Sequence, residues 1–255
     1  MSAIETTWLI GEFVLASNAT VTVNATPKVI AAGRYYLRDS TAARSLVDKL
    51  ADIIDDVVPG STVTICKDRL LRIVSGGGAL TLAIPASLQA VTGLAASPTV
   101  GTTVTADAIS TLLWSPGWPE TPTGNPTHAD GFDVSDRTLL VSPTGLTASA
   151  VIHAEQRHAS WSWQAVAAAR VWTASDAGGE FHRFRDDVLM PARRFKLYTA
   201  ISEDAASATA VSWSTAKGPY IARELPDDWY RRTVENTDAV GADIELAAIK
   251  TSEIP

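Results

Sequence analysis

Short runs of alternating apolar and polar residues occur between residues 8 and 37, and this alternation is typical of strands that bury one face. The runs cover residues 8–15, 20–23, 29–30 and 33–37. From Leu46 to Val57 the apolar spacing changes to i, i+4, i+7 and i+8, behind a possible N-cap at Ser40 or Thr41. This spacing predicts an amphipathic helix over residues 41–57.

Turn residues separate the next three apolar runs, which cover residues 62–65, 70–74 and 80–84. Such spacing predicts a meander of three strands. Residues 87–91 then predict a short helix, because Gly93 follows at the place where a left-handed residue commonly ends a helix.

A proline-rich segment divides the chain in two. It contains Pro116, Pro119, Pro122 and Pro126, which exclude regular structure because proline lacks a backbone donor. We expect residues 115–136 to form a linker or arm between a β-rich domain at residues 1–114 and another at residues 137–255. Whether the two halves are separate domains stays open.

The second half is also rich in strand patterns, with one helix over residues 179–189 that Pro191 ends. Residues 161–171 fit either a helix or a strand. The expected strands cover residues 138–141, 146–163, 195–200, 210–214, 220–224, 230–235 and 243–249. The predicted fold class is therefore a β-rich α+β fold, with antiparallel sheets in a sandwich or barrel-like arrangement, two amphipathic helices and a long proline-rich loop.

Composition and charge narrow the functional classes. The formal net charge is −7, which disfavours tight, sequence-independent binding of phosphate backbones. Cys66 is the only cysteine, so no intramolecular disulfide forms, and its apolar setting predicts a buried, inert thiol. We expect no targeting signal and no membrane span, because polar residues interrupt every long apolar stretch.

The candidates for catalysis and ligand binding are weak. Gly76, Gly77 and Gly78 lack the Gly-Lys-Ser/Thr ending and the helix of a phosphate-binding loop, so a hairpin turn is the better interpretation. His128, Asp130 and Asp133 are a possible metal-ligand set, but oxygen-rich turns are more often solvated. We therefore predict a non-enzymatic protein with no catalytic, cofactor-binding or metal-binding residues.

Basic and aromatic residues interleave around Phe195, a pattern that also occurs where proteins bind single-stranded nucleic acid. The structural alternative is a strand with Arg194 and Lys196 on one face and Phe195 and Leu197 on the other, in the core. We favour the strand, because the chain is acidic overall.

Eight tryptophans are many for 255 residues. Trp114, Trp118, Trp161 and Trp163 are candidate interface residues, since exposed indoles anchor protein interfaces and stack on sugars. Burial in the core is the equal alternative.

Several segments together resemble the virion proteins encoded among the tail genes of tailed bacteriophages. They are RYYLRDSTAARSLVDKL at residues 34–50, the strand meander, ASLQAVTGL at residues 86–94, LLWSPGWPE at residues 112–120, residues 181–198 and DIELAAIK at residues 243–250. The resemblance implies a tail tube, tail terminator or distal-tail component, made in the host cytoplasm and located in the virion. It also implies a homo-oligomeric ring or tube around a DNA channel, with neighbouring virion proteins as partners.

Two other hypotheses remain. The chain could be a carbohydrate-binding or receptor-binding module that uses its tryptophans. It could also be a hydrolase assembled from distant residues such as Asp130, Asp133 and His153, because catalytic groups need to be close only in space.

Overall fold

The computed structural model describes residues 4–96, 99–115, 127–141, 148–167, 180–202, 208–214, 216–224, 230–233 and 241–251. Along most of β11, β12 and β16 and the start of β17 it describes the backbone alone. Within these residues the chain has a β-rich α+β fold with antiparallel sheets and three α-helices, so the predicted fold class is confirmed.

The largest sheet joins the beginning of the chain to its end. Its ten strands follow the order β10-β1-β13-β15-β17-β12-β11, with β4 on β1, β14 on β13 and β16 on β17. The strands are β1 Ile4–Leu15, β4 Gly33–Tyr36, β10 Leu113–Trp114, β11 Thr127–Val141, β12 Ala148–Ala167, β13 Phe195–Ser202, β14 Ser212–Trp213, β15 Lys217–Glu224, β16 Tyr230–Thr233 and β17 Gly241–Lys250.

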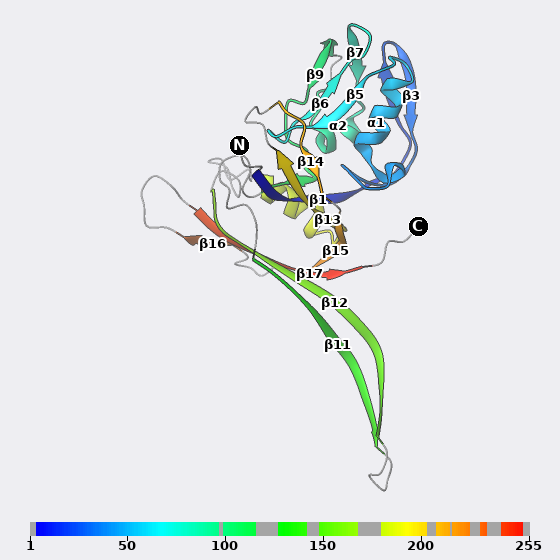
Figure 1. Ribbon diagram of the computed structural model, residues 1–255. Helices are drawn as coiled ribbons and strands as arrows, with labels where there is room; N and C mark the ends of the chain where they lie inside the picture. The colour runs from blue at the N-terminus through cyan, green and yellow to red at the C-terminus, as the bar shows by residue number, and fades with distance from the viewer. Residues whose placement is uncertain are drawn as a thin grey trace.

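Two small sheets and two helices form a lobe beside this large sheet, over residues 19–105 (Figure 1). We call this part the N-terminal lobe. One sheet has the order β3-β2-β7-β8 and the other β5-β6-β9. Their strands are β2 Ala19–Val23, β3 Thr26–Ile30, β5 Thr62–Ile65, β6 Leu71–Val74, β7 Leu80–Ala83, β8 Thr99–Gly101 and β9 Thr103–Thr105.

The first predicted helix begins later than expected. A 3-10 turn occupies Ala42–Arg44, and α1 spans Leu46–Asp55. The reason is Ser45, which has an extended backbone and whose hydroxyl accepts a hydrogen bond from the Asp48 N–H, so Ser45 is the N-cap. The predicted apolar face is correct, since Leu46, Leu50 and Ile54 are buried.

The other two helices agree with the sequence. Helix α2 covers Ala86–Thr92 and ends at Gly93, which has the left-handed φ of 72°. Helix α4 covers Glu180–Phe184 and widens into a π-helix at Arg185–Leu189. Phe181, Phe184 and Val188 on the predicted face are fully buried.

The predicted three-strand meander is wrong in its last strand. β5 pairs with β6, but β7 pairs with β2 and β8 in the other small sheet. The chain crosses between the sheets at Ser75–Ala79, where Gly76 lies against Pro59 so closely that a Cβ would sit 2.3 Å from the Pro59 carbonyl oxygen. Gly78 has a φ of 113°, which suits glycine alone.

The large sheet crosses the expected domain boundary. β1, from the first half, pairs with β13, from the second half, from Ile4↔Ser202 to Gly11↔Phe195. Residues 127–136, expected within the linker or arm, belong to β11, whereas residues 116–126 lie outside the described part of the chain. The division into two domains stays a prediction, and any such division must share one sheet.

Candidate assembly surface

The candidate assembly surface is a long hairpin formed by β11 and β12. The two strands pair from Thr127↔Ser162 to Val141↔Ala148. β12 also pairs with β17, but only from His158 to Ala167. Beyond that point, residues 132–141 of β11 and 148–157 of β12 pair only with each other among the described strands. We call these residues the arm.

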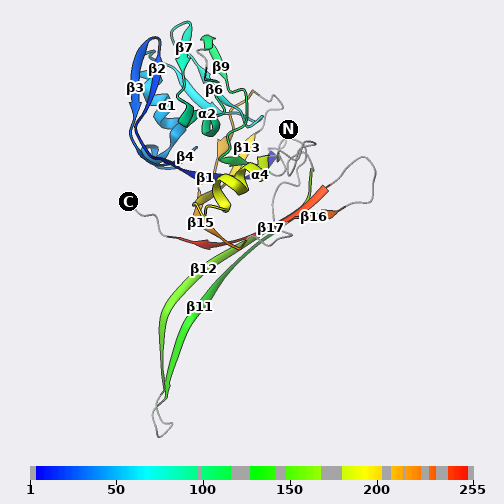
Figure 2. The ribbon, with the colours of Figure 1, turned by 180° about the vertical axis from the view of Figure 1, so that it is seen from behind.

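The arm leaves the rest of the molecule. Figures 1 and 2, which view the chain from opposite sides, show it extending away from the large sheet, in the direction opposite to the N-terminal lobe. Ten residues of strand correspond to roughly 33 Å of length. A ribbon of two strands is only marginally stable alone in water, so an arm of this length is stabilised best by a surface that covers it.

Among the described strands, β11 is an end strand of the ten-stranded sheet along its whole length. An end strand presents a row of backbone N–H and C=O groups that can pair with another chain. The sequence of residues 127–136 contains Asp130, Asp133 and Asp136 and no lysine or arginine. This segment is therefore an acidic strand edge.

The four tryptophans predicted as interface residues divide into two groups. Trp114, Trp161 and Trp163 are buried in the core, and each of these residues is at most 2% exposed. Trp114 meets Trp163 edge-on at 5.3 Å between ring centroids, and Trp161 meets Tyr220 at 4.9 Å. For these three the core alternative holds, because their strands are covered within the chain. Trp118 lies outside the described residues.

The residues proposed for metal binding or hydrolysis lie on the two strands of the hairpin. His128 pairs with Trp161, and Asp130 with Ala159, in the backbone register. His153 lies near the irregular register around Asp136, several residues from Asp130 and nearer the far end of the hairpin. In the described part of the chain, no group of three or more His, Cys, Asp or Glu side chains is placed to hold a metal ion.

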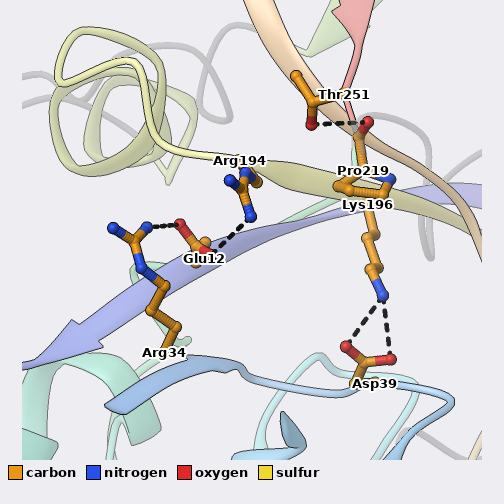
Figure 3. Close-up of polar contacts among 7 residues, drawn as sticks. All are labelled: Glu12, Arg34, Asp39, Arg194, Lys196, Pro219 and Thr251. Carbon is orange, nitrogen blue, oxygen red and sulfur yellow. Dashed lines mark hydrogen bonds and ion pairs between the residues drawn. The ribbon is translucent and has the colours of Figure 1, made fainter. Parts of the chain in front are cut away.

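The predicted strand around Phe195 is present as β13. Phe195 and Leu197 are buried, as alternation predicts. Lys196 is buried too, because the start of β13 is covered on both faces. The Nζ of Lys196 donates to both carboxylate oxygens of Asp39, at 2.9 and 3.0 Å (Figure 3). It also lies 4.8 Å from the centre of the Tyr36 ring.

A second ionic contact lies two residues farther along β1 than Ile10, the register partner of Lys196. Glu12 is 3% exposed, and its carboxylate accepts a hydrogen bond of 2.9 Å from Arg34 and lies 4.0 Å from Arg194 (Figure 3). Glu12 stands where β1 stops pairing with β13 and starts pairing with β4. These contacts join the large sheet to the chain that enters the N-terminal lobe.

The sequence interpretation missed Asp39 and Glu12. A signal was present for Glu12, since a carboxylate interrupts the apolar run from Trp8 to Leu15. Nothing local marks Asp39, whose partner is 157 residues away.

The cysteine is buried as the sequence predicts, but the glycine run is not a hairpin turn, because β6 and β7 lie in different sheets and do not pair. Gly76, Gly77 and Gly78 lie in the connection between β6 and β7, and no helix follows them at once. Cys66 is 1% exposed, and burial raises the pKa of its thiol above the usual value. A raised thiol pKa leaves little thiolate at neutral pH, so this cysteine is a poor nucleophile.

No described helix is long and apolar enough to cross a membrane. No protein-family model, curated protein or solved structure matches this chain in the comparisons. The arm and its acidic edge are therefore the features on which a function can be argued.

Proposed function

We propose that this chain is a structural subunit of a tailed-bacteriophage virion, a tail component that assembles with copies of itself into a ring or tube around a DNA channel. The assignment to a phage tail rests on the sequence resemblance. Neighbouring virion proteins are the other partners, and the site of action is the virion.

The observation that carries the assembly part of the proposal is the arm. Its two strands, residues 132–141 and 148–157, pair only with each other among the described strands and lie apart from the rest of the molecule. Exposed strand edges are a common means by which one chain pairs with the next. An arm that would be marginally stable alone gains stability when a neighbouring subunit covers it.

The charge of the chain fits a channel through which DNA passes without adhering. A net charge of −7 disfavours contact with phosphates, since like charges repel. This supports passage of DNA rather than specific binding of nucleic acid.

Shortening the arm tests the proposal. Val134 and Glu155 are register partners, so joining them through Asn-Gly makes a two-residue hairpin and leaves the pairing of β12 with β17 in place. We expect the full chain to form rings or tubes visible by electron microscopy, and the shortened variant to remain a folded monomer by sedimentation velocity.

The control variant Ser149→Thr keeps the full length and the charge of the arm. It should assemble like the full chain. The proposal fails if the full chain stays monomeric at high concentration and is also missing from purified virions.

A further inference from the structure

A half-open groove of about 330 Å³ lies where the N-terminal lobe meets the large sheet. Four of its lining residues, Val47, Val63, Ile65 and Val211, are apolar and buried. Arg38, Thr64, Ser212 and Trp213 also line it. The groove runs between two strands, β5 and β14.

β5 presents an open backbone edge to this groove. The Cys66 N–H donates to the Leu70 carbonyl, and this bond sets the alternation of the β5–β6 ladder. By that alternation the N–H and C=O groups of Val63 and Ile65 point away from β6. The Ile65 carbonyl accepts from the Val211 N–H, and the Lys67 N–H donates to the Thr209 carbonyl, so this end of β5 is already bridged to residues 209–211. Among the described residues, the backbone of Val63 has no hydrogen-bond partner on this side, so the open part of the edge lies at Val63.

One of the lining residues carries a positive charge. The guanidinium of Arg38 lies 5.2 Å from the centre of the Trp213 ring, a cation–π contact. Among the described residues, no carboxylate lies within ion-pair distance of this guanidinium. The groove thus offers four buried apolar side chains, open backbone groups at Val63 and a cation.

These three properties match an extended, acidic strand. Residues 127–136 of β11 are such a strand: an end strand of the large sheet with three aspartates and no lysine or arginine. We infer that the groove between β5 and β14 receives this edge of β11 from a second copy of the chain, an inference that rests on the proposed function.

The direction of the arm excludes a contact within one chain. Figures 1 and 2 show the β11–β12 hairpin running away from the lobe that holds β5. The contact therefore joins two different surfaces of two copies. Such a head-to-tail contact generates rings when the rotation closes and filaments when it does not.

Reversing charges on each side tests this contact with the full chain. One variant is Arg38→Glu, with Arg38→Gln as a milder second variant in case the first fails to fold. The other replaces Asp130, Asp133 and Asp136 with arginine. We expect each charge-reversed protein alone to need at least tenfold more protein for assembly than wild type, measured by sedimentation velocity.

Mixing the two charge-reversed proteins is the decisive measurement. In an alternating mixture, every groove of one variant meets a strand of opposite charge from the other, so differently tagged copies should co-assemble and co-purify. Arg183→Glu makes the same charge change on α4, outside the groove, and should assemble like wild type.

Two results would overturn the groove contact while leaving the proposed function intact. One is that wild type assembles and Arg38→Glu assembles equally well. The other is that the two variants fail to co-assemble. If wild type assembles neither in solution nor in virions, the proposed function fails and the groove contact fails with it.

Discussion

Lys196 and Asp39 form an ion pair inside the protein. The Nζ atom lies 2.9 and 3.0 Å from the two carboxylate oxygens, and the side chains are 3% and 0% exposed. Asp39 also accepts hydrogen bonds from the Thr41 N–H and the Ser40 hydroxyl. The pair connects β13 of the large sheet to Asp39 within the N-terminal lobe, so it helps to hold these two parts together.

Removing the cation should strongly destabilise the protein. Lys196→Met leaves the carboxylate of Asp39 buried without a counter-charge, which typically costs about 3–5 kcal/mol. Urea unfolding measures this as a fall in the free energy of unfolding. Lys250→Met, on an exposed position of β17, is the control and should change stability by less than about 0.5 kcal/mol.

The double variant Lys196→Met with Asp39→Asn should recover part of the loss, because it removes the uncompensated charge and keeps an acceptor for Thr41. A loss below about 1 kcal/mol for Lys196→Met alone would show that the pair contributes little.

A second prediction concerns the contact between β1 and the π-helix. A Cβ added at Gly11 would lie 2.2 Å from Cγ2 of Val188, which is fully buried and stiff because it is β-branched. Gly11→Ala should therefore cost about 1–3 kcal/mol through overpacking. Gly11→Ala combined with Val188→Ala should cost less than the sum of the two single changes, by about 0.5–3 kcal/mol.

A thermodynamic cycle of these four proteins by urea unfolding supplies the coupling. Additivity within about 0.5 kcal/mol would contradict the close approach of the two residues.

The strands inside the core were predictable because burial leaves a pattern. β5 begins and ends where alternation predicts, and the apolar face of α4 is correct, since each buries one side against the rest of the chain. The order of the strands was not predictable. β1 pairs with β13 across about 190 residues, and nothing in either strand encodes that distance.

The first part of β11 was missed for a different physical reason. Residues 127–136 include HADGFD, whose aspartates and glycine are typical of a turn, and an end strand needs no buried alternating face. The hydrogen-bond ladder with β12 therefore sets the strand, and not a pattern that single-sequence reasoning can detect. The linker or arm predicted over residues 115–136 overlaps the candidate assembly surface only at residues 127–136. Three of the four tryptophan candidates, Trp114, Trp161 and Trp163, are buried in the core.

The buried thiol gives a prediction about pH. Burial raises the pKa of Cys66 in the folded protein, so the native state holds this proton more tightly than the unfolded state does. The contribution to stability is complete below the unfolded pKa, about 8.5, and is lost as the pH rises through the raised folded pKa. The free energy of unfolding should therefore fall more between pH 8 and pH 10 for wild type than for Cys66→Ala.

The comparison with Cys66→Ala removes the effect of lysine and tyrosine titration, which both proteins share. Parallel curves for the two proteins over this range would contradict the prediction. A thiol reagent should also react slowly with the native protein at pH 7, because both access and thiolate are limited.

The arm should exchange its amide hydrogens quickly until a neighbour covers it. In dispersed monomer the amides of residues 137–141 and 148–152 depend on a two-stranded ribbon, which opens at little free-energy cost. The amides of β13, which lies between β1 and β15, open only with the core.

Hydrogen exchange read by mass spectrometry should show the arm exchanging at least a hundredfold faster than β13 in the monomer. In rings or tubes the difference should shrink by tenfold or more. An arm already protected like β13 in the monomer would mean that it is stable without a neighbour, and the main reason for assigning it to assembly would be lost.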